Sequence, residues 1–154
     1  MKLSEKTITL LATFFYVGKF PIAPGTLASF AGMLLAITFY RCPLGYAVLT
    51  AVITIIGFKV SGQLETILNK KDPSCVVIDE VAGILIAFFL LPLTPTIIIV
   101  TFFLFRAFDM FKIFPVNKFE KYDGATGIMM DDIVAGVYTN LVMQVAIRLS
   151  SLIS

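Results

Sequence analysis

The sequence predicts an all-α fold, a polytopic membrane helical bundle with about four to five membrane segments and a short N-terminal helix at the membrane surface. Composition is the first reason. The 154 residues are 58% hydrophobic and 14% charged, and the mean hydropathy is +0.96, unlike a soluble globular domain. The second reason is that apolar runs close to spanning length alternate with short polar segments. At this length the whole chain, 1–154, is expected to form a single integral membrane domain.

Missing residue types exclude several classes of function. The chain has no histidine, which excludes His-based triads and imidazole metal sites. The net charge of +2 comes from scattered basic residues without a sustained basic run, so nucleic-acid binding is not expected. Cys42 and Cys75 have no CxxC neighbour, which favours small apolar fillers over a zinc or redox site. Acid and base chemistry is therefore left to carboxylates, Lys, Tyr or a metal.

The N-terminal region is expected to hold a surface helix and a first membrane segment. The apolar run 7–17 is too short to cross the hydrocarbon core and lacks a signal-peptide cleavage site. Two prolines then exclude regular helix until about Gly25, and Thr26 is the predicted N-cap of an apolar segment at 26–40. A Gly-Thr helix start also offers free backbone N–H groups for an anion such as phosphate, although most such turns only start helices.

A second membrane segment is predicted at 44–60, after a tight turn at 41–43. The following loop, 59–73, is polar and net positive, which places it in the cytoplasm by the positive-inside tendency. A last spanning helix is predicted at 133–149. It ends near Arg148, which would face outward if the 79–105 stretch is a hairpin, and one outward positive charge runs against that tendency.

The apolar stretch 79–105 has two possible topologies, because prolines interrupt it at 92–95. A single kinked span would put the polar region that follows on the opposite side of the membrane from the 59–73 loop. A helical hairpin would return that region to the same side, which suits its basic residues and gathers the acids at one membrane face. The hairpin is the favoured prediction, and it requires a short or tilted first arm.

Half of the ten acidic residues border or enter apolar segments, where an ionised carboxylate is costly unless it is paired or bound to a metal. Two adjacent pairs would repel one another unless a cation is present, and all-oxygen ligands favour Mg²⁺ or Mn²⁺ over zinc. In the plainer alternative, Asp109 pairs with Arg106 or Lys112, and Asp79 and Asp131 only cap helices. The second adjacent pair is placed at the N-terminus of the last helix. The five acids are Asp79, Glu80, Asp109, Asp131 and Asp132.

A stripe of charge ends the long apolar stretch. Arg106, Asp109 and Lys112 recur every three residues and would share one helix face. Arg106 suits bidentate contact with phosphate, and Lys112 suits a point-charge contact. Beside a divalent cation, these residues predict a phosphoryl-transfer site at the membrane surface.

A short pattern, D-x-V-A-G, occurs at 79–83 and again at 132–136. The Ala and Gly that lie three and four residues after each Asp would let two helices approach closely. The pattern therefore predicts two acid-headed helices packed side by side. Chance similarity in a chain rich in Val, Ala and Gly is the alternative.

Four motifs in order and at comparable spacing resemble the bacterial phosphatidylglycerophosphatase A family: PIAPGTLAS, VVIDEVAG, FRAFDMFK and GATGIMMDDIVAG. The resemblance implies a Mg²⁺-dependent lipid phosphatase that converts phosphatidylglycerophosphate to phosphatidylglycerol and phosphate. It also implies a multi-pass protein of the bacterial cytoplasmic (inner) membrane, with the active site facing the cytoplasm. Carried over by motif, the five acids look like the family's acidic set.

A division of roles follows as a hypothesis. One or two Mg²⁺ ions are bound by Glu80, Asp109 and Asp132, with Asp79 as a further ligand, and Asp79 or Asp131 orients or deprotonates the attacking water. A covalent aspartyl-phosphate with Asp109 as nucleophile is the alternative. The residues expected to stabilise the transferring phosphoryl group are Arg106, Lys112, Lys19 and Thr26.

Two other classes of function remain as alternatives. A small cation-coordinating transporter or channel subunit would use the acids alone, so substitution of Arg106 and Lys112 should leave its activity largely intact. An assembly subunit without activity would tolerate Asn at Asp79, Asp109 and Asp132.

Overall fold

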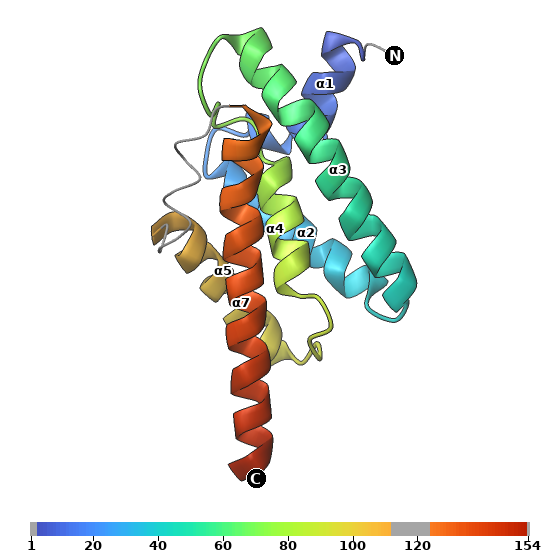
Figure 1. Ribbon diagram of the computed structural model, residues 1–154, viewed down its shortest axis with the longest axis vertical. Coiled ribbons are helices and arrows are strands. Elements are labelled where there is room, and N and C mark those ends of the chain that lie inside the picture. The colour runs from blue at the N-terminus through green and yellow to red at the C-terminus, as the bar shows by residue number, and fades with distance from the viewer. Residues whose placement is uncertain (1–2, 112–123, 154) are drawn as a thin grey trace.

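The computed structural model describes residues 3–111 and 124–153, and within these residues the regular secondary structure is helical throughout (Figure 1). The predicted all-α class is therefore confirmed. Six α-helices and one short 3₁₀ helix make up the described part of the chain. Their bounds are α1 Glu5–Ala12, η1 Val17–Lys19, α2 Pro24–Phe39, α3 Pro43–Leu68, α4 Ile78–Ala87, α5 Pro95–Phe111 and α7 Ala125–Ile153.

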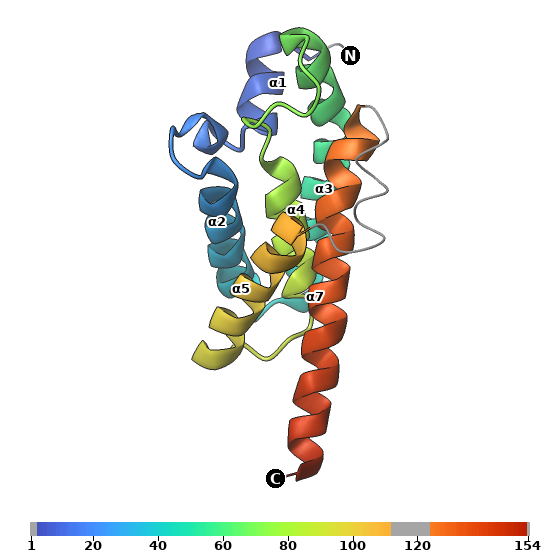
Figure 2. The ribbon, with the colours of Figure 1, turned by 90° about the vertical axis from the view of Figure 1, so that its left-hand side faces the viewer.

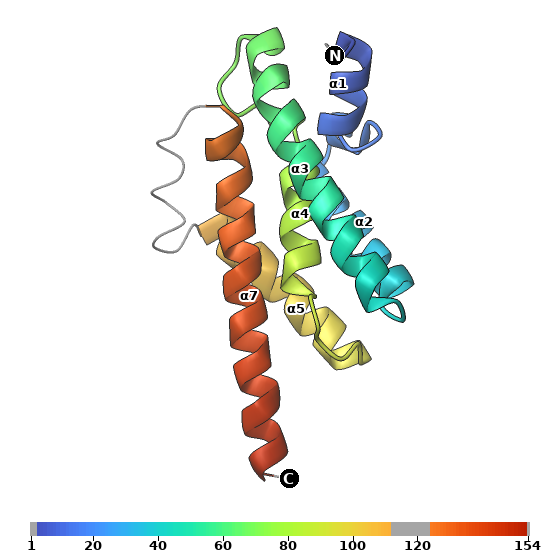
Figure 3. The same cartoon turned by 45° about the vertical axis from the view of Figure 1, so that its right-hand side comes forward.

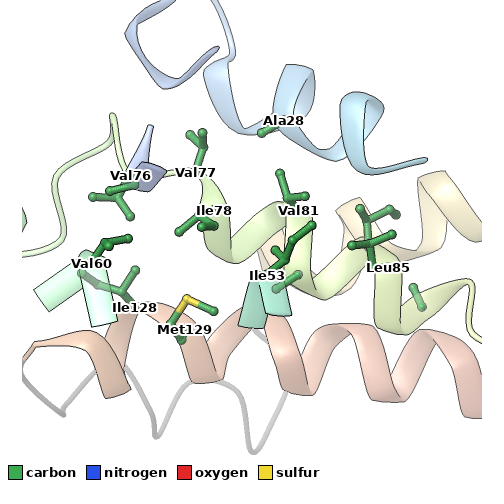
Figure 4. Packing of buried hydrophobic residues seen from close by; sticks show 14 of the residues in the cluster. Ala28, Ile53, Val60, Val76, Val77, Ile78, Val81, Leu85, Ile128 and Met129 are labelled. Carbon is green, nitrogen blue, oxygen red and sulfur yellow. The ribbon is translucent and has the colours of Figure 1, made fainter. Parts of the chain in front are cut away.

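The short helix α4 forms the centre of the bundle. All but two of its ten residues are buried, and α2, α3, α5 and α7 all contact it (Figures 2 and 3). Val81 and Leu85 of α4 point into a core shared with Ala28 of α2, Ile53 of α3 and the α7 residue Met129 (Figure 4). A helix that is apolar on every side after its first turn is expected in such a central position.

Two side chains from neighbouring helices complete the hydrogen bonding at the end of α4. The Tyr46 hydroxyl donates to the Leu85 carbonyl at 2.6 Å, and the Asn140 amide donates to the carbonyls of Ala87 and Phe89 at 3.1 and 2.7 Å. The last carbonyls of a helix lack partners within the helix. These contacts let α4 end inside an apolar environment after only ten residues.

The two D-x-V-A-G segments pack against each other, as predicted. A Cβ atom added at Gly136 would overlap the Gly83 carbonyl oxygen, and one added at Gly83 would lie 2.6 Å from the Asp132 carbonyl oxygen. Backbone therefore meets backbone where α4 and α7 cross, a closeness that only small residues allow. The two helices run in the same direction (Figure 1), so both acid-bearing ends lie at the same end of the bundle.

The chain turns back between α4 and α5. Residues 88–94 form the turn, Pro95 starts α5, and α5 runs back towards the first turn of α4 (Figure 2), so residues of both helices line one pocket. The single kinked span is therefore wrong, and the proline-bounded turn is confirmed. At 1.5 Å per residue, α4 is roughly 15 Å long, about half the thickness of a hydrocarbon core.

Three predicted helix boundaries are wrong. Helix α2 begins at Pro24 with Ala23 as its N-cap, so Thr26 lies in the first turn and is not the cap. Proline fits this position because a first-turn residue needs no N–H partner. Helix α3 continues to Leu68, because buried Val60 and Leu64 extend its core-facing stripe through the predicted 59–73 loop.

Helix α7 begins at Ala125, several residues before its predicted start. Asp131 and Asp132 consequently lie in its second turn and are not N-terminal caps. Near the N-terminus, α1 ends at Ala12, because Phe14, Phe15 and Tyr16 adopt positive φ angles of 43°, 55° and 68°.

Two helices in the described part of the chain, α3 and α7, are long and apolar enough to cross a membrane, and α2 is a shorter apolar helix. This is fewer than the predicted four to five segments. The outward face of α3 is apolar over several turns, with large exposed side chains at Leu44, Val48, Val52 and Ile55. A continuous exposed apolar stripe of this kind is typical of a lipid-facing surface.

The close crossing of α4 and α7 can be tested with Gly136→Val. The added side chain would meet the Gly83 backbone, which has no rotamer to move, so unfolding should become easier by roughly 1–3 kcal/mol. Thermal unfolding of purified protein in detergent measures the change. Ala146→Val adds bulk at an exposed position of the same helix and should shift stability by less than about 0.5 kcal/mol. Equal effects of the two substitutions would contradict the crossing.

Candidate active site

A pocket of about 450 Å³ lies at the end of the bundle where the predicted acids meet. The start of α2, the loop before α4, the first turn of α4, the end of α5 and the second turn of α7 surround it. Its lining consists of Ala23, Pro24, Gly25, Thr26, Asp72, Ser74, Val76, Asp79, Glu80, Arg106, Asp109, Met110, Ile128, Asp131 and Asp132. All five predicted acids therefore reach one pocket, which the hairpin between α4 and α5 makes possible.

Three of these acids form a tight group. One carboxylate oxygen each from Asp79, Glu80 and Asp132 lies within 4.8 Å of the others. Asp79 and Asp132 are almost fully buried, at 8% and 4% exposure. Asp79 Oδ1 and Glu80 Oε2 are buried and have no hydrogen-bond partner among the described residues. Such oxygens suit a hard divalent cation, so the group could hold a metal ion.

Electrostatics in the first turn of α4 lead to the same conclusion. This turn lies outside the two candidate spans. Burial raises the pKa of Glu80 to about 7, and burial together with the neighbouring Glu80 charge raises the pKa of Asp79 well above its usual range. The ionised forms are therefore unfavourable without a compensating positive charge. A bound cation would supply that charge.

Arg106 and Asp109 form an ion pair on α5. Arg106 Nη1 lies 2.5 Å from Asp109 Oδ2, and the side chains are only 15% and 18% exposed. Arg106 Nη1 also donates to the Ser29 hydroxyl at 3.3 Å, while its Nε is buried without a partner among the described residues. Asp109 thus pairs with Arg106 and is not in the group of three, so its expected role as a metal ligand stays a prediction.

The start of α2 closes the pocket over the acids. A Cβ atom added at Gly25 would overlap Glu80 Oε1 and lie 3.7 Å from Arg106 Nη1, so a larger residue here would displace the Glu80 carboxylate. The N–H groups of Gly25 and Thr26 belong to the first turn of α2, which has no preceding helical carbonyls to accept them. Thr26 therefore reaches the pocket in a first turn suited to an anion.

Of the predicted phosphate ligands, one lies away from this pocket and another cannot be placed. Lys19 is exposed and does not line the pocket. Its Nζ lies 5.0 Å from the centre of the Tyr16 ring. Lys112 lies outside the described residues. Their proposed contacts with phosphate remain predictions.

Sequence reasoning assigned no role to Ser29, Asp72 or Ser74. Ser29 belongs to the PIAPGTLAS motif, so the motif was the available signal. Asp72 and Ser74 line the pocket but carry no local signal, since their approach depends on the path of the loop between α3 and α4.

Buried carboxylates, a partly buried arginine and a helix N-terminus share one pocket at the end of an apolar helical bundle. This arrangement indicates a class, a helical membrane protein whose pocket could hold a cation beside an anion. The particular family is phosphatidylglycerophosphatase A, whose family model matches residues 10–147. The chain belongs to this family of phosphoric monoester hydrolases.

Three curated bacterial proteins are similar to the chain over most of its length. A Bacteroides thetaiotaomicron protein, provisionally named a phosphatidylinositol-3-phosphatase, is 35% identical over 89% of this chain and 91% of its own. Phosphatidylglycerophosphatase A of Haemophilus influenzae is 34% identical over 88% of this chain and 86% of its own. That of Escherichia coli K12 is 35% identical over 83% of this chain and 76% of its own. No solved structure matches.

Cation binding at the group of three can be tested with Asp132→Asn. In EDTA, the variant should unfold at a higher temperature than the wild type, because one of three crowded carboxylates, whose ionised forms are unfavourable there, is removed. Added Mg²⁺ should stabilise the wild type, by about 3 kcal/mol at a hundred times Kd, and should stabilise the variant much less.

Thermal unfolding with and without Mg²⁺ measures both effects. Glu5→Gln, at an exposed acid in α1, should respond to Mg²⁺ as the wild type does. An equal Mg²⁺ response in Asp132→Asn would show that the cation binds elsewhere.

Proposed function

We propose that the protein is a Mg²⁺-dependent lipid phosphatase that hydrolyses the terminal phosphomonoester of phosphatidylglycerophosphate to phosphatidylglycerol and phosphate. Membership of the phosphatidylglycerophosphatase A family supports the reaction class. The observation that carries the proposal is that the three grouped carboxylates and Arg106 line one pocket. A cation site beside an anion site is the arrangement that phosphoryl transfer requires.

The group of three is the proposed cation site. Asp79, Glu80 and Asp132 would hold Mg²⁺, since their buried oxygens suit a hard ion and the chain contains no histidine. When bound, Mg²⁺ supplies a Lewis acid that offsets negative charge on the phosphate oxygens.

Arg106 and the start of α2 are the proposed phosphate site. The buried Arg106 Nε lacks a partner among the described residues and can donate to a phosphate oxygen. The first-turn N–H groups of Gly25 and Thr26 can donate to another. Charge that develops on the transferring phosphoryl group would then be stabilised by donors already held in position.

Water attack is the favoured chemistry. Asp131 lines the pocket and is not in the group of three, so it is the proposed base that takes a proton from water. The water oxygen bonds to phosphorus, the ester P–O bond breaks, and the leaving oxygen gains a proton. Asp109 as a nucleophile is the less favoured alternative, because Arg106 already engages its Oδ2. A trapped phosphorylated Asp109 would overturn water attack.

The test is phosphate release by purified protein in detergent. Phosphatidylglycerophosphate should be hydrolysed with Mg²⁺ and not in excess EDTA. Asp132→Asn should lower the rate at least about a hundredfold, and Arg106→Lys should lower kcat/KM by a similar factor because the bidentate fork is lost. A transporter or channel subunit would instead tolerate Arg106→Lys.

Each variant must be folded, shown by a cooperative thermal unfolding transition above the assay temperature, and Glu5→Gln serves as the matched acid-to-amide control with unchanged activity. Phosphatidylinositol-3-phosphate and phosphatidic acid belong in the same assay, since the relatives' names differ in head group. Release from one of these instead would change the proposed substrate. No release from any of the three by folded protein would overturn the phosphatase.

We also propose that residues 1–154 form one domain with four to five membrane segments in the bacterial cytoplasmic membrane, with α4 as a short arm that does not span by itself. Lys70 and Lys71 lie in the loop that leads from α3 to the pocket, and Lys59 lies in the C-terminal half of α3. These basic residues support a pocket facing the cytoplasm. In this arrangement the turn between α2 and α3, which contains the exposed Cys42, faces outward.

Cysteine labelling in whole cells tests this orientation. With Cys75→Ser, the native Cys42 should react with a membrane-impermeant maleimide added outside. With Cys42→Ser, Cys75→Ser and Lys70→Cys, the new thiol should react only after the membrane is opened. The reverse pattern would place the pocket outside the cytoplasm.

A further inference from the structure

Ser29 is a fully buried polar residue at the edge of the site, with 0% exposure. It lies in α2, one turn after Gly25, and its hydroxyl donates to the Gly25 carbonyl at 2.9 Å. The same oxygen accepts a hydrogen bond from Arg106 Nη1 at 3.3 Å. One hydroxyl therefore joins the start of α2 to the guanidinium of α5.

The two contacts of Arg106 have different consequences. Asp109 lies three residues further along the same helix, so this ion pair moves with α5 as a unit. Ser29 lies on α2, and its hydrogen bond fixes the guanidinium relative to a second helix. That second helix carries Gly25, which lies against Glu80. The position of Arg106 relative to the group of three therefore depends on Ser29.

Hydroxyl chemistry suits this position. A helical serine commonly donates to the carbonyl four residues earlier, which leaves its oxygen lone pairs available to an outside donor. A hydrogen bond from a charged donor is stronger than one between neutral groups. Alanine would remove the acceptor and leave a guanidinium N–H without this partner.

We propose that Ser29 is a positioning residue: its hydrogen bond holds the Arg106 guanidinium in the orientation in which it contacts the substrate phosphate. The inference rests on the proposed phosphatase function. Ser29 itself does not touch the phosphate, and it acts through the orientation of Arg106. Small displacements of a phosphate-binding group lower rates strongly, because the donor must meet charge that develops in the transition state.

The primary test compares Ser29→Ala with Ser61→Ala. Ser61 is also fully buried, with its hydroxyl 3.7 Å from Met129 Sδ, and it does not line the pocket. Ser29→Ala should lower kcat/KM about tenfold or more, as expected for loss of a hydrogen bond to a charged group. Ser61→Ala should not. If Ser29→Ala folds poorly, Ser29→Cys replaces it in the test. Cysteine has a similar volume and a weaker acceptor, so the same loss of kcat/KM is expected.

A double-mutant cycle with Arg106→Gln separates positioning from a structural role. If Ser29 acts through Arg106, Ser29→Ala should have little further effect once Arg106 is replaced. Equal losses in both backgrounds would overturn the inference, and so would a Ser29→Ala variant as active as Ser61→Ala.

Binding of orthovanadate, followed as a rise in unfolding temperature, gives a readout that does not need turnover. Ser29→Ala should weaken it about tenfold and Ser61→Ala should not. An inactive wild type that still binds vanadate through Ser29 would overturn the proposed function but not the positioning role. If the wild type is active but Ser29→Ala binds vanadate as tightly as the wild type does, the positioning role is overturned and the proposed function is not.

Discussion

The backbone contact between Gly83 and Gly136 is the constraint on which the rest of the structure depends. It lets α4 and α7 run in the same direction at a separation that any larger side chain would prevent. Because the two glycines occupy equivalent places in the repeated D-x-V-A-G pattern, the acids that precede them meet at the same level. Asp79 and Asp132 thereby come close enough to share one group with Glu80.

Burying three carboxylates in an apolar bundle is unfavourable, and the surrounding structure is arranged around that difficulty. Desolvation penalises the charged forms, yet these carboxylates line a pocket at the end of the bundle. Arg106, which contacts Asp109 and Ser29, lines the same pocket near Glu80. The pocket therefore brings carboxylates and a guanidinium together, an arrangement that could hold a cation beside an anion.

Two further segments, a turn and the start of a helix, complete the pocket. The turn at 88–94 returns α5, with Arg106, to the acids. The start of α2 approaches so closely that Gly25 lies against Glu80, and Ala23 takes a left-handed conformation to begin the helix. Neither segment supplies the grouped carboxylates. Both determine the positions of the N–H donors that would face a bound phosphate.

Composition and local pattern were sufficient for the all-helical class, the candidate acids, the close packing of the two D-x-V-A-G helices and the family, since these depend on residue types at fixed spacings. Helix ends were predicted less well. The number of polar residues indicated a loop at 59–73, but core contacts of Val60 and Leu64 extend α3 into it. Arg106 was one of two partners that the sequence offered for Asp109, and the structure shows this ion pair. The contact of Ser29 with Arg106 and the approach of Asp72 and Ser74 came only from the folded structure. Which side chains meet across helices depends on crossing angles and loop paths, and these are properties of packing between distant parts of the chain.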